Sequence, residues 1–288
     1  MTQSNQTARS TSPSDGKAIN RIRTRLEAGE AAVGAFLQLG STEIVEIAGE
    51  VGYDFVVIDC EHGAFGLETA VQLIRTAEAA GTMPIVRVAG GTLKELGQFL
   101  DAGAMGLLVP QIASAEQARA VVSASKYRTE KFPAGTRGAC PSVRSTRYGS
   151  PAWAEHATRS NRDCAVWLLV ESAEGMDNLP QILDVPGIDG IQFGEFDLAV
   201  SMGCDGDRSH PAVLAKLEGA IELVRSRGID VICFLDGWDR AAAAASRERL
   251  AAKGCRILLG AVDARIVFNV FRDRCDAARH GAHSLKGI

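Results

Sequence analysis

Ionisable residues stand where several short apolar runs of the sequence end. One run ends at Asp59 and His62, and the next ends at Arg87. Two later runs end at Glu171 and Asp197. Short apolar runs are typical of buried parallel strands, and the carboxyl ends of such strands carry the chemistry of α/β enzymes. The pattern therefore predicts an active site at one end of a parallel sheet.

Glu171 and Asp197 end successive strands, so we expect their side chains to be neighbours. Two adjacent carboxylates repel each other unless a cation lies between them. Paired oxygen ligands suit Mg²⁺, Mn²⁺ or Co²⁺, whereas zinc usually takes histidine or cysteine ligands, and none is placed alongside. The pair is interpreted as a divalent-metal site, with helix capping by each acid as the alternative.

The other three charged residues have the chemistry of a proton-transfer site. His62 is placed to act as a general base near neutral pH. Arg87 stays protonated and could stabilise a developing oxyanion. Asp59 could orient His62 or hydrogen-bond a metal-bound water. The structural alternatives are a surface histidine, an ion pair of Arg87 with Asp59 or Glu61, and a loop cap by Asp59.

Missing residues narrow the chemistry further. The seven lysines all fall on expected helices, loops or tails, so no lysine is placed to form a Schiff base at a strand end. The sequence has no Walker loop and no GxGxxG fingerprint. A metal, a base and an arginine together suit the formation of an enolate from a 2-oxo acid.

Eight apolar runs alternate with amphipathic helical stretches along the chain. This alternation predicts a single (β/α)8 TIM barrel rather than an open doubly wound sheet. The expected strands are 32–39, 55–58, 85–88, 106–109, 165–171, 190–194, 231–235 and 257–260. The expected helices are 19–28, 42–51, 67–80, 93–102, 115–125, 174–183, 211–227, 240–253 and 264–279. Residues 127–162 are expected to form an irregular loop over the strand ends.

The composition sets limits on partners and location. At 288 residues and 46% hydrophobic content the chain can form one large barrel domain, expected over 19–280, with tails at 1–18 (disordered) and 281–288. A net charge of −4 without a basic stripe argues against nucleic-acid binding, and no apolar run reaches membrane-spanning length. The seven scattered cysteines form no CxxC pair, which predicts buried, reduced thiols in a cytoplasmic protein.

Several motifs, in order, resemble the HpcH/HpaI family of class II pyruvate aldolases. They are VVIDCEHG at 56–63, the strand ending in Arg87, LLVPQI at 107–112, GTRG at 135–138, LLVESAEGMDNL at 168–179 and FGEFDLAVSMG at 193–203. The resemblance covers about residues 19–279. It implies a barrel of the phosphoenolpyruvate/pyruvate type that depends on a divalent metal. It also implies a homo-oligomer, usually a hexamer built as a dimer of trimers with helix exchange.

The resemblance also implies roles for individual residues. Glu171 and Asp197 match the metal ligands, His62 the base and Arg87 the enolate-stabilising arginine. Asp101 matches an acid that raises the basicity of the histidine.

The resemblance places substrate binding at Gly194 and at the backbone amides of Phe196 and Asp197. The chain departs from the family pattern at Leu169, where glutamine is common, and at Gly194-Glu195, where Gly-Pro is usual. These changes remove a side-chain hydrogen bond to substrate and add a charge beside the mouth.

The sequence thus predicts a metal-dependent aldolase that cleaves a 4-hydroxy-2-oxo acid to pyruvate, or a related 2-oxo acid, and an aldehyde. Two alternatives use the same site, because an enolate can also be protonated or attack an acyl donor. They are decarboxylation of oxaloacetate and a citrate-synthase-like condensation. A barrel that binds oxo acid and metal without turnover is a further alternative, because a fold does not fix a function.

Overall fold

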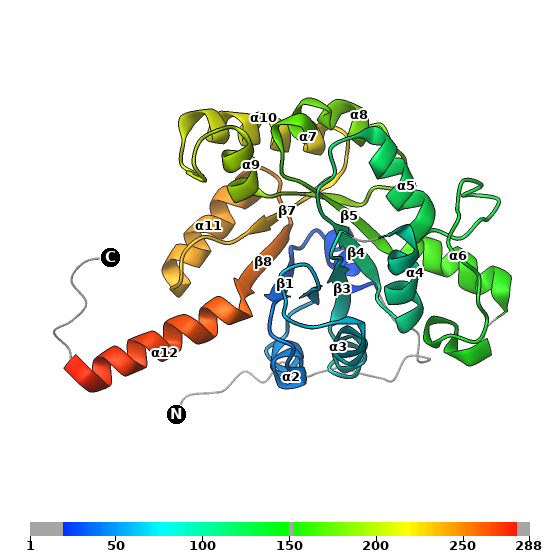
Figure 1. Ribbon diagram of the computed structural model, residues 1–288, viewed down its shortest axis with the longest axis horizontal. Coiled ribbons are helices and arrows are strands. Elements are labelled where there is room, and N and C mark those ends of the chain that lie inside the picture. Colours follow the sequence, from blue (N-terminus) through cyan, green and yellow to red (C-terminus); the bar gives the residue numbers. More distant parts are fainter. Residues whose placement is uncertain (1–19, 91, 150–151, 281–288) are drawn as a thin grey trace.

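The computed structural model describes residues 20–90, 92–149 and 152–280, and within them eight parallel strands close into one barrel in the order β1 to β8. Figure 1 shows helices packed around the outside of the strands, with α12 projecting away from the barrel. The (β/α)8 barrel expected from the sequence is confirmed. The expected tails at 1–18 and 281–288 lie outside the described residues.

The barrel strands are four to six residues long. They are β1 Ala32–Leu37, β2 Phe55–Asp59, β3 Met83–Arg87, β4 Gly106–Val109, β5 Ala165–Val170, β6 Gly190–Phe193, β7 Asp230–Phe234 and β8 Ile257–Val262. The helices are α1 Arg21–Glu27, α2 Thr42–Glu50, α3 Leu67–Ala79, α4 Leu93–Ala102, α5 Ala115–Ser125, α6 Trp153–Asp163, α7 Ala173–Asp177, α8 Leu179–Leu183, α9 Glu195–Ser201, α10 Pro211–Ser226, α11 Arg240–Ala252 and α12 Asp263–His280. A 3₁₀ segment, η1, spans Arg144–Gly149.

Side chains alternate between two hydrophobic cores along each strand, as the two-residue period of a strand requires. Phe55 and Val57 of β2 and Trp167 and Leu169 of β5 fill the inside of the barrel. Their neighbours in the sequence, such as Val56, pack outward against the helices. On β2, β3 and β5, the inward-facing positions at the carboxyl ends are occupied by the charged residues of the candidate site.

Local sequence signals fix where several helices begin and end. Ser41 and Asp239 accept hydrogen bonds from the amides of Ile44 and Ala242, as expected for N-caps. Ser114 forms a full capping box with Gln117. Gly103 follows α4 with a φ of +108°, in the left-handed region. Glycine can end a helix in this conformation without steric strain, because it has no side chain.

Two expected elements are wrong. The single helix expected at 174–183 is two short helices, α7 and α8, which meet at Asn178. The expected loop at 127–162 instead contains η1 and α6. This segment lies by the amino-terminal ends of the strands, because Lys126 donates to the carbonyls of Asn161 and Cys164 just before β5.

Two further expectations concern membranes and cysteines. No helix among the described residues is long and apolar enough to cross a membrane. All seven cysteines are free thiols. Only Cys164 and Cys255 are buried, so the expectation that most of the thiols are buried is wrong.

Candidate active site

The carboxyl ends of β2 and β3 are joined by a buried ion pair. Asp59 is completely buried, and its two carboxylate oxygens accept hydrogen bonds from Arg87 Nε at 2.7 Å and Nη2 at 2.6 Å. Burial alone would raise the pKa of Asp59, but the hydrogen bonds and charge of Arg87 outweigh it and hold the pKa below its usual value. Two planar groups paired in this way fix the orientation of the guanidinium.

Glu61 completes the surroundings of Arg87 on the side of His62. Its carboxylate lies 3.0 Å from Arg87 Nη1 and 3.9 Å from His62 Nε2. Burial raises the pKa of Glu61, although the charges of Arg87 and His62 oppose the shift. The His62 side chain is 64% exposed, so its ring is open to a ligand at the mouth of the barrel.

The structural alternatives expected for Arg87 and Asp59 are therefore present. Arg87 pairs with both Asp59 and Glu61, and Asp59 also accepts from the backbone amides of Glu61 and His62, which caps the loop. These contacts do not exclude a role at the substrate. A guanidinium has five N–H groups and these contacts take three, so two remain for a ligand.

Two polar residues that the sequence did not identify support this network. The side-chain amide of Gln38, just past β1, donates from Nε2 to Asp59 Oδ2 at 3.0 Å. Asp263, at the start of α12, accepts from the backbone amides of Gln38 and Leu39 and so holds Gln38 in place. Asp263 could have been found as the polar residue that opens the last helix, whereas Gln38 carries no sequence signal of its own.

Glu171 follows β5 and is fixed by a backbone contact from the loop between β4 and α5. Its Oε1 accepts from the amide of Gln111 at 2.8 Å, and Gln111 holds a left-handed φ of 59°. Such a conformation is costly for a residue with a side chain and is often found at functional sites. Burial raises the pKa of Glu171, and the charges of Glu61 and Asp197 raise it further. The three acids therefore share one region of the mouth.

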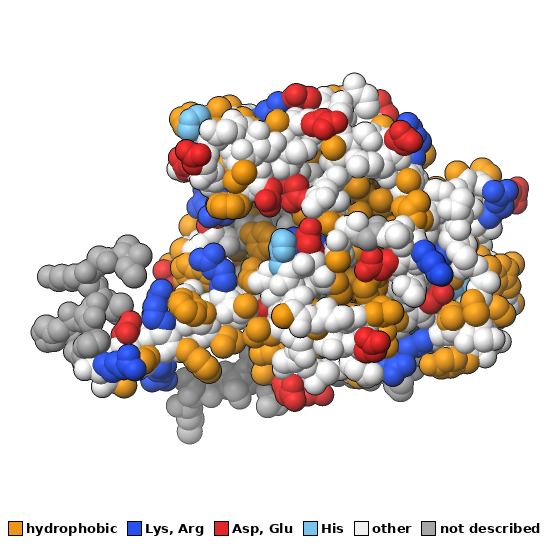
Figure 2. Space-filling view, viewed as in Figure 1, with side chains coloured by type: hydrophobic (Ala, Val, Ile, Leu, Met, Phe, Trp, Pro, Cys, Tyr) orange, Lys and Arg blue, Asp and Glu red, His pale blue; other side chains and the backbone are white. Residues whose placement is uncertain are grey.

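Asp197 lies in the first turn of a helix, α9, that the sequence analysis did not predict. The strand before it ends at Phe193, and the backbone turns at Gly194. A Cβ added to Gly194 would lie 2.6 Å from Cβ and 2.7 Å from Oε2 of Glu171, so only glycine fits here. The amides of Phe196 and Asp197 are in the first turn and have no acceptor within the helix. Figure 2 shows acidic and histidine side chains gathered around a hollow on this face.

The acids of this site offer carboxylate oxygens, which are the ligands that a divalent cation such as Mg²⁺ prefers. Neither Glu171 nor Asp197 has a protein cation as an ion-pair partner among the described residues, although burial and like charges penalise Glu171. No group of three or more histidine, cysteine or acidic side chains is arranged around a metal position in the described part of the chain. A metal would therefore take these two carboxylates and complete its shell with water and substrate oxygens.

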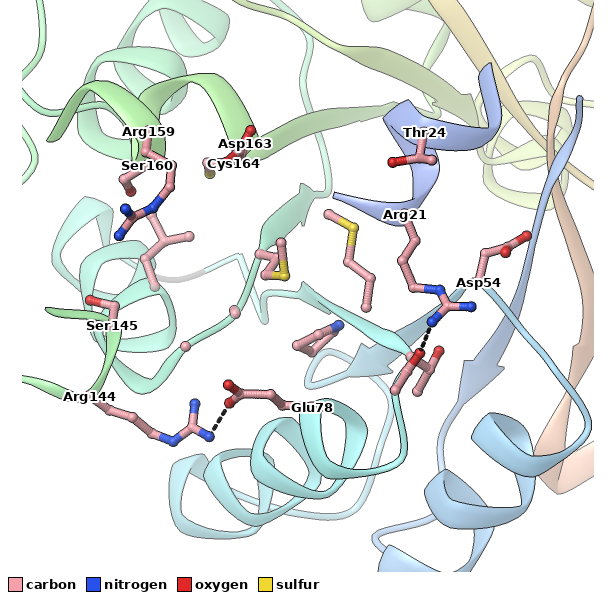
Figure 3. A pocket seen from close by; sticks show the side chains of 18 of the residues that line it. Arg21, Thr24, Asp54, Glu78, Arg144, Ser145, Arg159, Ser160, Asp163 and Cys164 are labelled. Carbon is pink, nitrogen blue, oxygen red and sulfur yellow. Dashed lines mark hydrogen bonds and ion pairs between the residues drawn. The ribbon is translucent and has the colours of Figure 1, made fainter. Parts of the chain in front are cut away.

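Asp101 lies away from this group of residues within the chain. It is near the end of α4, at the amino-terminal face of the barrel, and its carboxylate pairs with Arg137 at 3.0 Å. Arg137 lines a cavity of about 990 Å³ bordered by the start of β3 and the residues before β4 and β5. Figure 3 shows this cavity, which Arg21, Arg144 and Arg159 line from three separate elements. It is at the opposite end of the barrel from His62.

The two departures from the family pattern have clear positions. Leu169 is buried inside the barrel, one inward step below Glu171. Glu195 opens α9 at the rim of the mouth and lies 3.7 Å from Arg208, which partly balances its charge.

Comparison with known proteins identifies the family. The family model for HpcH/HpaI aldolase/citrate lyase matches residues 32–268. A hydroxypyruvate/pyruvate aldolase from Pseudomonas aeruginosa is 31% identical over 270 residues, covering 92% of this chain and 94% of the relative. A 4-hydroxy-2-oxo-heptane-1,7-dioate aldolase from Escherichia coli is 34% identical over 210 residues, covering 73% and 78%. A solved citrate synthase, SbnG, aligns with a TM-score of 0.79 and 27% identity over 91% of this chain and 98% of that one.

With the barrel and the charged mouth in place, these matches decide the class of enzyme. The chain belongs to the HpcH/HpaI aldolase/citrate lyase family, as its motifs indicated, and it is an aldolase-type lyase.

Proposed function

We propose that this enzyme cleaves a 4-hydroxy-2-oxo acid to pyruvate, or a related 2-oxo acid, and an aldehyde, with a divalent metal at Glu171 and Asp197. The observation that carries the proposal is the arrangement of Arg87. It is locked by Asp59 and Glu61 beside an open His62, and it shares the mouth with two further acids. The names of the two aldolase relatives support the same substrate class.

The roles of the side chains follow from their chemistry. Bound Mg²⁺, Mn²⁺ or Co²⁺ would polarise the 2-oxo group and so acidify the neighbouring C–H bonds. His62 accepts the proton of the 4-hydroxyl group as the C3–C4 bond breaks and the aldehyde leaves. The bonding electrons pass into an enolate whose oxygen faces the two free N–H groups of Arg87. Protonation at C3 then yields the 2-oxo acid, and the same steps reversed give aldol addition.

The first-turn amides of Phe196 and Asp197 are proposed to hold the carboxylate of the oxo acid. Free amides at a helix start favour an anion, and Gly194 lets the backbone approach Glu171 closely. Asp101 is proposed to support His62 from a neighbouring subunit, because within this chain the two lie at opposite ends of the barrel.

A homo-oligomer, of the hexameric kind that the family resemblance implies, is part of the proposal. The α12 helix projects from the barrel and exposes Ile266, Phe268, Val270 and Phe271, a hydrophobic surface that a second copy could cover (Figures 1 and 2). The free cysteines support a cytoplasmic location.

The test is product analysis after the enzyme is freed of metal and reloaded with Mg²⁺ or Mn²⁺. Pyruvate with a panel of aldehydes should give 4-hydroxy-2-oxo acids, and these products should be cleaved in the reverse direction. Absence of both reactions with every metal would reject the proposal.

A citrate-synthase-like condensation is the second candidate, favoured by the similarity to SbnG over nearly the whole barrel. The enolate of an acetyl thioester, formed at the same site, would then add to the ketone carbon of oxaloacetate, and hydrolysis of the thioester would release coenzyme A. Incubation with oxaloacetate, with and without acetyl-coenzyme A, separates a condensation product from simple decarboxylation to pyruvate.

A further inference from the structure

Gln192 is a buried amide in an otherwise apolar part of the barrel. It lies on β6 and is 5% exposed, and neither its Oε1 nor its Nε2 has a hydrogen-bond partner in the described structure. Its side chain points inward, since a Cβ on Gly190, two residues earlier, would contact Trp167 and Ile232 of the interior core. The partners of Gln192 in the neighbouring strands are Leu169 and Ile232, which offer no hydrogen bond.

An unpaired amide in such a place is unfavourable for folding. A buried polar group without a partner loses its hydrogen bonds to water and gains none in return. A methionine or leucine would fill the same space inside the barrel at a lower cost. An orphaned buried group in a native structure therefore calls for a partner that arrives later.

The position of Gln192 indicates what that partner is. A Cβ added to Gly194, one inward step above it, would lie 2.7 Å from a carboxylate oxygen of Glu171. Leu169, its register partner, is one inward step below Glu171. Gln192 thus lies on the floor of the mouth, beneath the place where the proposed function puts the 2-oxo acid. Leu169 occupies the position at which the family resemblance implies a glutamine that binds substrate.

We propose that Gln192 is an oxo-acid-binding residue of this enzyme, whose unpaired side-chain Nε2 donates a hydrogen bond to an oxygen of the bound 2-oxo acid. Leu169 on β5 has no side-chain amide. Gln192, its register partner on the adjacent strand β6, supplies one instead. The inference rests on the proposed function, and it assigns a substrate contact that the family pattern does not contain.

Gln192→Met tests the contact, because methionine keeps the length and flexibility of the side chain and removes the amide. Gln72→Met, on the exposed face of α3, is the matched control. The probe is oxalate, a planar analogue of the pyruvate enolate, whose affinity for the Mn²⁺-loaded protein is measured by calorimetry. We expect Gln192→Met to weaken oxalate binding and raise KM for pyruvate about tenfold, with a smaller change in kcat. Gln72→Met should change none of these.

The unfolding midpoint of the protein without metal or oxalate distinguishes a binding role of Gln192 from a structural one. If Gln192 stabilised the fold, Gln192→Met would lower this midpoint. Removing an orphaned amide should leave this midpoint unchanged or raise it. The double variant Leu169→Gln with Gln192→Met should recover part of the oxalate affinity. Unchanged oxalate affinity in Gln192→Met would overturn the inference. So would a lost affinity that the double variant does not recover, if the unfolding midpoint is also lowered.

Failure of the inference and failure of the proposed function give different results. Oxalate binding is measured without turnover. If the wild-type protein binds oxalate through Gln192 but makes no aldol product, the proposed function fails and the contact stands. If the wild-type protein makes aldol product and Gln192→Met binds oxalate normally, only the contact fails. A wild-type protein that does not bind oxalate with Mn²⁺ overturns both.

Discussion

Arg87 combines a fixed orientation with free hydrogen-bond donors. Asp59 holds one edge of its guanidinium through two short hydrogen bonds, and Glu61 contacts the remaining nitrogen. The ring of Phe36 covers it, with its centroid 4.8 Å from Cζ. A flexible cation would have to be ordered during the reaction, whereas this one is ordered in advance.

Arg87→Lys tests this arrangement. A lysine ammonium cannot reproduce the paired contact with Asp59 and cannot face an enolate oxygen at the same time. We expect enolisation to fall about 10²-fold, the size of effect seen when one oxyanion donor is lost. The rate of pyruvate methyl-proton exchange in deuterated water measures this step. Exchange at the wild-type rate would remove Arg87 from the proposed role.

Asp59→Asn should reduce stability and change its pH dependence. The folded-state pKa of Asp59 is below its unfolded value, so its contribution is complete above pH about 4 and is lost as pH falls through the lower folded pKa. We expect a loss of about 3 kcal/mol at pH 7 and a weaker decline in acid, because a buried pair is broken. Urea unfolding between pH 3 and pH 7 measures both quantities.

The control for Asp59→Asn is Asp177→Asn, which breaks an exposed pair with Lys216 and should cost less than about 1 kcal/mol. Equal losses in the two variants would contradict the account of Asp59.

Sequence reasoning found the charged residues of the site but missed several of their supports. Asp59, Arg87 and Glu171 could be predicted because each interrupts an apolar run. The side-chain amide of Gln38 and the backbone amide of Gln111 could not, since both are positioned by loops whose conformation the sequence does not specify. Gln192 was hidden inside a run of strand type, and its unpaired oxygen is apparent only in three dimensions.

At the scale of elements, the junction of β6 and α9 brings the second acid to the site. The strand ends at Phe193, the chain passes Gly194 beside Glu171, and Asp197 follows within the first helical turn. The sequence analysis read this segment as a strand ending in acid, because a seven-residue helix is too short to give a clear periodic pattern. The long elements, in contrast, were placed to within about three residues, because their caps and periodicity agree.

Gly194→Ala should disrupt the proposed metal site while leaving the barrel folded. The added methyl group would collide with the Glu171 side chain and push its carboxylate away. We expect weaker binding of Mn²⁺ in calorimetry. We also expect a loss of activity of about 10²-fold, since a misplacement of a catalytic group by about 1 Å is enough for such a loss.

Gly219→Ala, in α10, is the control for this variant. A Cβ at Gly219 meets nothing within 4 Å, and alanine should stabilise the helix by about 0.5–1 kcal/mol with normal activity. If both variants bind Mn²⁺ as the wild type does, the close approach at Gly194 has no part in the metal site.

At the scale of the whole molecule, the barrel puts Asp101 and His62 at opposite ends. Asp101 lies in the last turn of α4 and pairs with Arg137, and His62 follows β2. A strand of five or six residues spans roughly 17–20 Å, too far for a hydrogen bond within one chain. The exposed hydrophobic residues of α12 supply a separate reason to expect an oligomer.

Mixed oligomers test whether the site is shared between subunits. His62→Ala and Asp101→Ala should each be inactive or nearly so. Combined under conditions that allow subunit exchange, they should recover part of the activity, because some sites would receive both intact residues. Native mass spectrometry confirms mixing. Demonstrably mixed oligomers without recovery would leave Asp101 as a partner of Arg137 alone.

The central claim is that this chain forms an oxo-acid enolate with a metal held by Glu171 and Asp197. The most direct measurement is deuterium exchange of the pyruvate methyl protons, followed by NMR before chelation, after chelation, and after reloading with Mn²⁺. Exchange should stop on chelation, return with the metal, and be absent in Glu171→Gln and Asp197→Asn at any Mn²⁺ concentration that supports the wild type. Exchange that persists without metal, or that borohydride abolishes by trapping pyruvate on a lysine, would contradict the account.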